Sequence, residues 1–292
     1  MDTSRLVALL NVSALVTIML SMGLQVTFED VLLSARRARQ LLLGLFANYV
    51  LVPAVTLGLL CVFQANPMVS VGLLIVAACP GAPVGPPITA IARGDVPWSI
   101  GMMLILAGLS AILSPALLSV LLARIAPDSS LHINYLAIVQ TLLITQLLPL
   151  AIGLGIHHVA RRLSQAIVTP VDLLGKALLL SLVGMLVITQ YESLAAIHRR
   201  GWMGMGLLLA ASLGIGWFCG GPDVRTRKAL AATTASRNVA VGLIIVGRNF
   251  AATPAVTAVV AYGLISIVGV LGWAWLIGRF AAIKPSSAHA TS

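Results

Sequence analysis

The stretch CPGAPVGPPITAIARGD, Cys79 to Asp95, decides the fold of this chain because it interrupts a segment that is otherwise suited to cross a membrane. It directly follows the apolar run MVSVGLLIVAA, residues 68–78. Four of its seventeen residues are prolines and three are glycines, and both residue types disfavour a continuous helix. Non-helical backbone at membrane depth is tolerated only where protein or a water-filled cavity covers it. The stretch therefore predicts a broken transmembrane helix whose break lies inside the protein.

The composition assigns the whole chain to the membrane. The 292 residues are 59% hydrophobic and only 9% charged, whereas soluble domains carry about 25% charged residues. The apolar runs are long and do not alternate with a ten-residue period, which predicts an all-α membrane protein and argues against an outer-membrane barrel. The net charge of +10 lies mostly between the apolar runs, where it sets orientation, so it does not indicate nucleic-acid binding.

The apolar runs predict about nine transmembrane helices, since each crossing needs about 20 apolar residues. The expected spans are 5–27, 39–63, 67–93, 97–123, 132–157, 169–190, 202–221, 224–250 and 254–280. The first run is longer than a signal-peptide core and is not followed by a cleavage motif, so we interpret it as a span. The chain is then one transmembrane domain over residues 1–283 with a disordered tail, 284–292.

The distribution of basic residues predicts the orientation. With the N-terminus outside, most of the eighteen Lys and Arg residues fall in inner loops, as the positive-inside rule requires. The C-terminus is then cytoplasmic. The strong preference for Arg over Lys suggests a bacterial source, hence a bacterial inner (plasma) membrane. Arg237 is the exception, because it lies in the middle of an expected span.

A second interrupted span, ALAATTASRNVAVGLIIVG at residues 229–247, has the polar centre TTASRN. The two interrupted spans occupy corresponding halves of the chain, which indicates an inverted-repeat transporter with its site at the breaks. The alternative, that each break is a loop between two short helices, is weaker because neither half could cross a membrane alone.

The breaks should create new helix starts. We expect one near Pro86 or Pro87, since proline is favoured at the first helical position, and one near Arg237 or Asn238. Helix starts expose free N–H groups and a partial positive charge, so two of them facing one cavity would attract an anion.

Arg237 is the strongest single candidate for function. A charged residue inside a membrane span is costly and usually functional, and the spans offer no acidic residue to pair with it. It either donates to backbone carbonyls at a half-helix end or faces a cavity and serves an anionic substrate; its five donors allow both. The candidate substrate-binding residues are Val84, Gly85, Pro86, Thr233, Thr234, Ser236, Arg237 and Asn238.

Several short motifs resemble the bile acid:sodium symporter family over nearly the whole chain. They are SMGLQV (21–26), CPG (79–81), ARGDV (92–96), LSP (113–115), KAL (228–230) and Asn238. The resemblance implies a core of two crossing broken helices with their neighbours, and a panel that moves against the core to give alternating access. The core would comprise spans 39–63, 67–93, 97–123, 202–221, 224–250 and 254–280, and the panel spans 5–27, 132–157 and 169–190.

The chain departs from this family at the sodium ligands that the resemblance implies. The corresponding positions read Asn48, Gly85, Pro86, Ser99, Met103, Thr233 and Arg237. Only Ser99 matches, and the family's carboxylate is replaced by Thr233. Because hard cations need several oxygen ligands, we expect degenerate sodium sites and make no firm assignment of a metal. Two sodium ions with one carboxylate carry a net charge of +1. Arg237 with the neutral Thr233 also carries +1, so Arg237 would replace the bound sodium as a permanent cation.

These observations predict a secondary transporter of a small organic anion, a carboxylate or a sulfonate, that needs no cofactor and is not conventionally coupled to sodium. Exchange and facilitated diffusion stay open, as does a monomer or a weak homodimer. The alternatives are a sodium-coupled symporter with rebuilt ion sites and a receptor that kept the fold without transport. A sodium/proton antiporter would need carboxylates inside the membrane, and an intramembrane enzyme would need an acid/base pair or a metal cluster.

Overall fold

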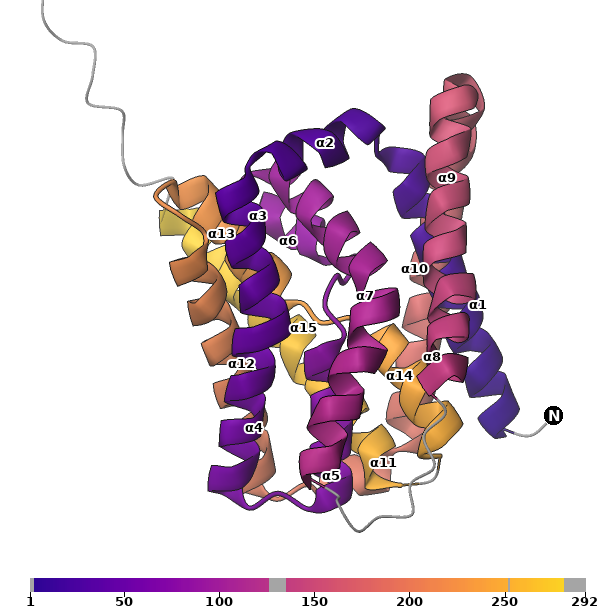
Figure 1. The fold of residues 1–292 in the computed structure, drawn as a ribbon. Helices are drawn as coiled ribbons and strands as arrows, with labels where there is room; N and C mark the ends of the chain where they lie inside the picture. The colour runs from indigo at the N-terminus through magenta and orange to yellow at the C-terminus, as the bar shows by residue number, and fades with distance from the viewer. Residues whose placement is uncertain (1–2, 126–134, 252, 281–292) are drawn as a thin grey trace, which may run out of the picture.

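The computed structural model describes residues 3–125, 135–251 and 253–280, and every regular element in these residues is helical (Figure 1). The elements are α1 (Thr3–Gln25), α2 (Phe28–Arg36), α3 (Ala38–Phe46), η1 (Ala47–Leu51), α4 (Val52–Phe63), α5 (Pro67–Ala78), α6 (Gly85–Ile91), α7 (Val96–Ile125), α8 (Tyr135–Leu142), η2 (Leu143–Leu147), α9 (Leu148–Val159), α10 (Arg161–Thr189), α11 (Tyr191–Ala195), α12 (Arg199–Cys219), α13 (Val224–Ala235), α14 (Val239–Asn249) and α15 (Pro254–Phe280).

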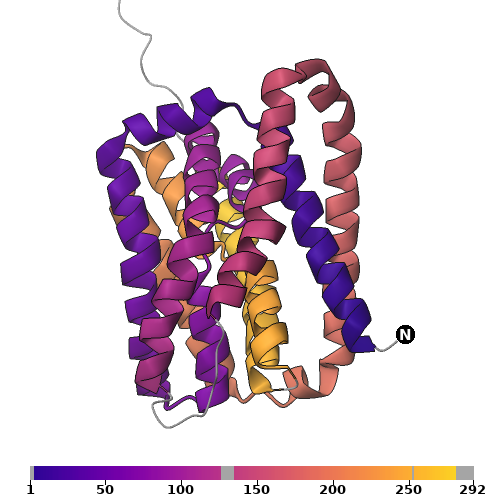
Figure 2. The same ribbon diagram turned by 45° about the vertical axis from the view of Figure 1, so that its right-hand side comes forward.

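The expected fold class is confirmed. Within the described residues, eight helical segments are long and apolar enough to cross a membrane, and they run roughly side by side as one bundle (Figure 2). The expected span 67–93 is not among the eight because its break divides it into α5 and α6, which are too short to count singly. The total of nine spans and the inverted repeat stay predictions, and the expected tail 284–292 lies outside the described residues.

Both interrupted spans are broken where the sequence predicts. α6 begins at Gly85 with proline in its first turn, and α14 begins after Asn238, whose side chain caps it by accepting a hydrogen bond from the Val241 N–H. Between α5 and α6, Gly81 adopts a φ of +84°. The two breaks touch, because the Asn238 N–H donates to the Cys79 carbonyl over 2.9 Å. The chain therefore crosses itself at the two breaks.

Two expectations, about the start of α10 and about the segment after α1, are wrong. α10 begins at Arg161 and not near residue 169, and it continues through Pro170. Asp172, expected at the end of a span, therefore lies within α10, where Lys176 one turn later neutralises it over 2.5 Å. The segment 28–36, expected as a loop, is the helix α2, whose start is fixed by a reciprocal capping pair between Thr27 and Asp30.

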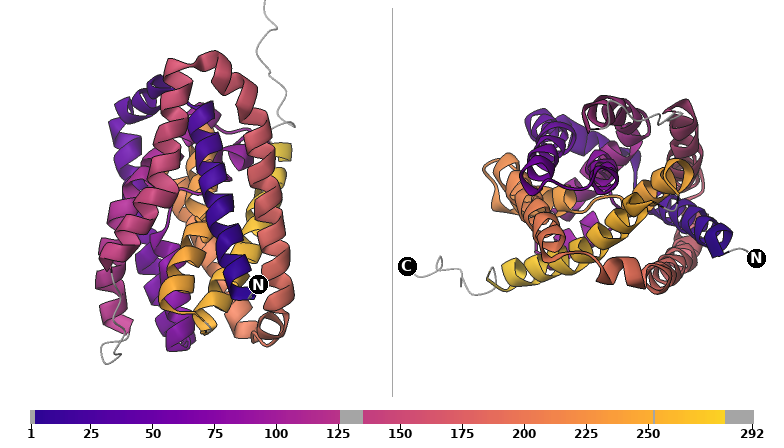
Figure 3. Two further views of the ribbon diagram at one scale, coloured as in Figure 1. Left: turned by 90° about the vertical axis from the view of Figure 1, so that its right-hand side faces the viewer. Right: turned by 90° about the horizontal axis from the view of Figure 1, so that it is seen from below.

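α1, α9 and α10 pack on one another, with α1 between the other two in the left view of Figure 3. α1 and α9 approach closely at Gly23 and Gly153, where a Cβ on either residue would overlap the backbone of the other helix. Small residues allow such close contacts between membrane helices. These three helices correspond to the expected panel spans. Their movement as one body against a core stays a prediction.

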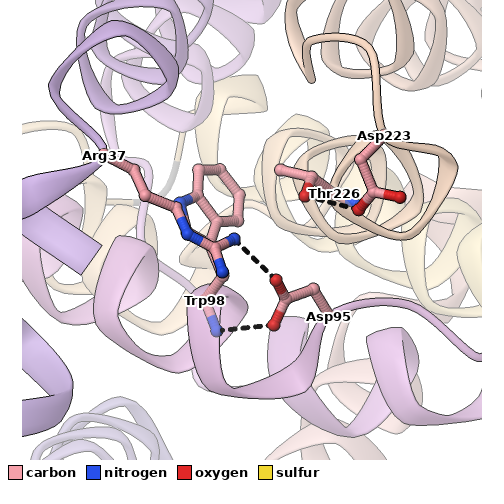
Figure 4. A network of polar contacts seen from close by, with 5 residues as sticks. All are labelled: Arg37, Asp95, Trp98, Asp223 and Thr226. Atoms are coloured by element: carbon pink, nitrogen blue, oxygen red, sulfur yellow. Dashed lines mark hydrogen bonds and ion pairs between the residues drawn. The ribbon is translucent and has the colours of Figure 1, made fainter. Parts of the chain in front are cut away.

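A polar network connects the turn between α2 and α3 with the starts of α7 and α13 (Figure 4). These ends of the helices lie opposite the N-terminal end of the bundle in Figure 1. The Asp95 carboxylate accepts from Arg37 over 2.7 Å and from the Trp98 N–H over 3.2 Å, and the Asp95 N–H donates to the Arg225 carbonyl. Asp223 caps α13 through Thr226. Burial raises the pKa of Asp223, but the hydrogen bonds from Thr226 outweigh it, so this pKa lies below its ordinary value. The network holds the starts of α7 and α13 side by side.

Candidate functional site

The crossing of the two breaks is a deeply buried polar region. In the segment from Val224 to Asn249, 83% of the most apolar 18-residue stretch is buried, whereas the share is 50% or less in each of the other seven candidate spans. Its break places Ser236, Arg237 and Asn238 at 2–3% exposure. Polar groups at such depth are normally paired, so their contacts indicate what the site can do.

Arg237 makes one hydrogen bond, from Nη1 to the Asn48 side-chain oxygen over 3.2 Å. The Asn48 amide in turn donates to the Gly44 carbonyl over 2.9 Å and to the Thr234 hydroxyl over 3.2 Å. Two roles are expected for Arg237: donation to backbone carbonyls at a half-helix end, or service to an anionic substrate. These contacts record neither role, because its hydrogen-bond partner is the Asn48 side chain. The remaining guanidinium nitrogens, Nε and Nη2, are buried without a hydrogen-bond partner among the described residues.

A local widening of the helix positions Asn48. The turn Ala47–Leu51 is a π-helix directly before Val52 and Pro53, and proline cannot donate the backbone hydrogen bond that a regular helix needs there. π-turns often occur at functional sites. The turn directs Asn48, fully buried, to the second break more than 180 residues later in the chain.

Three buried hydroxyls form a chain beside Arg237. Ser99 of α7 lies 2.9 Å from the Thr89 hydroxyl of α6 and 3.1 Å from the Thr233 hydroxyl of α13. Thr89 donates to the Gly85 carbonyl and Thr233 to the Ala229 carbonyl. The single Ser99 hydrogen can therefore be donated to only one of its two neighbours, and no carboxylate of the described residues hydrogen-bonds to the three hydroxyls.

The other predicted site residues lie around the row of three hydroxyls. Gly85 faces Thr233, since a Cβ at Gly85 would lie 3.5 Å from the Thr233 Cα. Pro86 is buried and Val84 is half-buried against an apolar cluster of α6, α12, α13 and α15. Met103 is 1% exposed and belongs to the main apolar core. The structure thus gathers the predicted residues, but Met103 offers only apolar packing.

A large cavity is lined by α1, α4, α5, α10, α11, α12, α14 and α15, at the end of the bundle that holds the start of α1. Its volume is about 1030 Å³. Its polar and basic lining includes Asn11, Gln190, His198, Arg200, Arg248 and Thr257. No acidic side chain lines it within the described residues, so its surface suits an anion with an apolar body.

None of the eight predicted substrate-binding residues lines this cavity. Its inner wall includes Leu73 of α5 and Ile244 of α14, each six residues from a break residue, Cys79 or Asn238. Six residues correspond to about 9 Å along a helix. Leu73 and Ile244 therefore form part of an apolar layer between the cavity and Arg237, whose side chain is 3% exposed.

Sequence reasoning missed Thr89, Asn11 and the lining of the cavity. Thr89 could have been found, because it lies one helical turn after Gly85 and so on the same face of α6. Asn11 lies in the first apolar run; it is 4% exposed and donates to the Ala240 carbonyl of α14 over 3.3 Å. The cavity draws its lining from eight helices, and no local sequence pattern reports that. No cluster of three or more His, Cys, Asp or Glu side chains occurs in the described residues.

The chain is similar to known transporters. The sequence model of the Sodium Bile acid symporter family matches residues 12–197. A Bacillus subtilis protein named "Uncharacterized sodium-dependent transporter YocS" is 25% identical over 252 residues, 82% of this chain and 74% of its own length. The "Probable sodium/metabolite cotransporter BASS1, chloroplastic" of Arabidopsis thaliana is 24% identical over 80% of this chain and 57% of its own.

The corresponding BASS2 protein of Oryza sativa subsp. japonica is 26% identical over 54% of this chain and 36% of its own length. The chain thus matches less than two thirds of each of the two plant relatives. The family match covers more than half of the chain, including the first break and most of the expected panel. This chain therefore belongs to the Sodium Bile acid symporter family, and it is a membrane transporter and not an enzyme.

Proposed function

We propose that the protein carries a small organic anion, a carboxylate or a sulfonate, by alternating access at the crossing of the two broken helices. The observation that carries this proposal is Arg237, a cation 3% exposed at the crossing with two unpaired donors. A buried cation of this kind costs several kcal/mol unless an anion compensates it. In a carrier for anions, the bound substrate would supply this compensating negative charge.

The large cavity would admit the anion from the end that holds the N-terminus. Its basic lining would attract the anionic group, and its apolar wall would accept the rest of the molecule. Movement of α1, α9 and α10 against the other helices would then open the apolar layer at Leu73 and Ile244. The substrate would reach Val84, Gly85, Pro86 and residues 233–238 in that state.

The hydroxyl chain supports transport without sodium. Ser99 lies at hydrogen-bonding distance from both Thr89 and Thr233, and all three side chains contribute only neutral hydroxyl oxygens. A hard cation binds through several oxygen ligands, usually with carboxylates among them, and here Arg237 supplies the positive charge instead.

We expect equal anion uptake in sodium and in sodium-free choline buffer. The measurement is counterflow into proteoliposomes with a panel of labelled carboxylates and sulfonates. Protein-free liposomes give the background. Uptake that is at least about tenfold faster in sodium would contradict the proposal, because it corresponds to about 1.4 kcal/mol of coupling to sodium.

That outcome would favour a sodium-coupled symporter with rebuilt ion sites, a candidate supported by the word "sodium" in the names of all three relatives. Ser99 and Thr233 would then be the first ligands to examine. Uptake of none of the anions would favour a receptor on the same fold.

We also propose a bacterial inner-membrane location with the N-terminus outside and a monomer or a weak homodimer. The support is the basic residues at the end opposite the N-terminus, among them Arg36, Arg37, Arg39 and Arg225. A fluorescent protein fused to the C-terminus should fluoresce in the cytoplasm, and alkaline phosphatase fused there should be inactive. The reverse pattern would overturn the orientation.

A further inference from the structure

The free edge of Arg237 has the geometry of a carboxylate clamp. Nε and Nη2 are the two unpaired nitrogens, and their N–H bonds point in parallel from one edge of the planar guanidinium. This fork matches the two oxygens of a carboxylate. Nη1, on the other edge, is held by Asn48, so the clamp has a fixed orientation.

The protein itself supplies no countercharge to this clamp. The ion pairs of the described residues are Arg37–Asp95 and Lys176–Asp172, and neither includes Arg237. The described acidic residues that remain, Glu29, Asp30, Glu192 and Asp223, lie in or beside α2, α11 and the start of α13, away from the break. Arginine also stays protonated in proteins, so the charge at the crossing is permanent.

From these facts we propose that the protein is an obligate exchanger of small monocarboxylates, an inference that rests on the proposed carrier function. A carboxylate in the Nε–Nη2 fork would neutralise Arg237 each time the site closes between the two sides of the membrane. Without cargo, the closed site would hold a bare charge in a low-dielectric interior, which is strongly unfavourable.

The permanence of the charge is what separates exchange from net transport. In a carrier that uses sodium, the cations leave together with the cargo, so the unloaded site returns without a bound cation. Arg237 cannot leave, so the unloaded site stays charged and returns slowly. A second carboxylate, bound on the other side, restores neutrality and allows the return.

The same charge balance limits the cargo. Arg237 is the one basic side chain in the break, and Lys228 lies nine residues earlier, nearer the inner end, where Arg93 is its electrostatic neighbour. One carboxylate balances one guanidinium, whereas a dicarboxylate or a phosphate dianion leaves an unpaired negative charge. The unpaired side-chain donors of Ser236 and Asn238 can bind further oxygens of a hydroxy acid.

The first step of the test finds the probe. The melting temperature of the purified full chain is measured in acetate, L-lactate, gluconate, methanesulfonate and chloride at equal ionic strength. At least one carboxylate should raise the melting temperature of the wild type and not that of Arg237→Gln. If no carboxylate does so, or if chloride acts equally well, the inference is overturned.

The second step measures influx of the most stabilising carboxylate, radiolabelled, into proteoliposomes. The vesicles contain either the unlabelled carboxylate or sucrose, and valinomycin with equal potassium clamps the membrane potential at zero. Influx into the carboxylate-loaded vesicles should be at least about tenfold faster. Equal influx into both overturns exchange and leaves the carrier function standing, whereas no influx into either overturns the carrier function as well.

Two further variants separate charge from geometry. Arg237→Lys loses the fork, and a lysine buried without a countercharge can lose its proton, so it should bind the carboxylate more weakly and require internal carboxylate for influx only at a pH low enough to keep the lysine protonated. Arg39→Gln removes an exposed arginine without a hydrogen bond in the described structure, and it should behave as the wild type. Influx through Arg237→Lys that stays independent of internal carboxylate even at that low pH would contradict the role of the charge.

Discussion

Replacing Arg237 with glutamine is expected to lower the rate of anion uptake at limiting anion concentration by about 100-fold. Loss of one partner of a buried charge pair costs about 2 to 5 kcal/mol, and a hundredfold change corresponds to about 2.7 kcal/mol. The same substitution should leave the melting temperature of the unliganded protein unchanged or raise it, because it removes a buried cation that no acidic side chain balances. The measurements are initial uptake rates and thermal unfolding in detergent.

The opposite signs of the two effects make the prediction specific. A residue that only holds the fold would lose uptake and stability together when it is replaced. A fall in the melting temperature of Arg237→Gln that parallels the loss of uptake would therefore show that Arg237 stabilises the crossing through Asn48, contrary to the proposed role. Uptake at the wild-type rate would remove Arg237 from the site.

Replacing Gly81 with valine should destabilise the protein by about 4 kcal/mol or prevent its recovery in folded form. Gly81 has a φ of +84°, which costs a residue with a side chain about 1 to 3 kcal/mol. Its Cβ would also lie 2.5 Å from the Ala107 backbone nitrogen, and overpacking adds about 1 to 3 kcal/mol. The measurement is the melting temperature and the yield of monodisperse protein.

Gly184 in α10 provides the matched control. It is exposed, and a Cβ there would meet nothing within 4 Å. Gly184→Val should therefore change stability by no more than about 0.5 kcal/mol. Equal behaviour of the two variants would mean that the close contact between the first break and α7 is not needed for the fold.

The sequence alone was sufficient to locate both breaks. Prolines and glycines at Cys79–Pro87 and the polar run at residues 233–238 leave no continuous apolar helix, and helix starts follow from local rules. The importance of Arg237 was equally local, since a charge without a partner in an apolar run is conspicuous in any sequence.

The partners of these residues could not be predicted in the same way. Asn48 is brought to Arg237 by a π-turn, whose extra residue leaves no clear signature in the sequence. Thr89 gains its role from Ser99 and Thr233, on two other helices, so its position depends on packing. α10 begins earlier than expected because paired charges, Asp172 and Lys176, are compatible with a helix although they interrupt the apolar pattern.

The bond between the Asn238 N–H and the Cys79 carbonyl joins the two breaks through main-chain atoms alone. Every amino acid except proline can donate that bond at position 238, and any amino acid can accept it at position 79. Substitution can therefore exchange the side chains around the crossing while the crossing persists. The backbone crossing can therefore be conserved in evolution while the ligand-binding side chains change. A lineage could then replace bound cations by a fixed arginine without a change of fold.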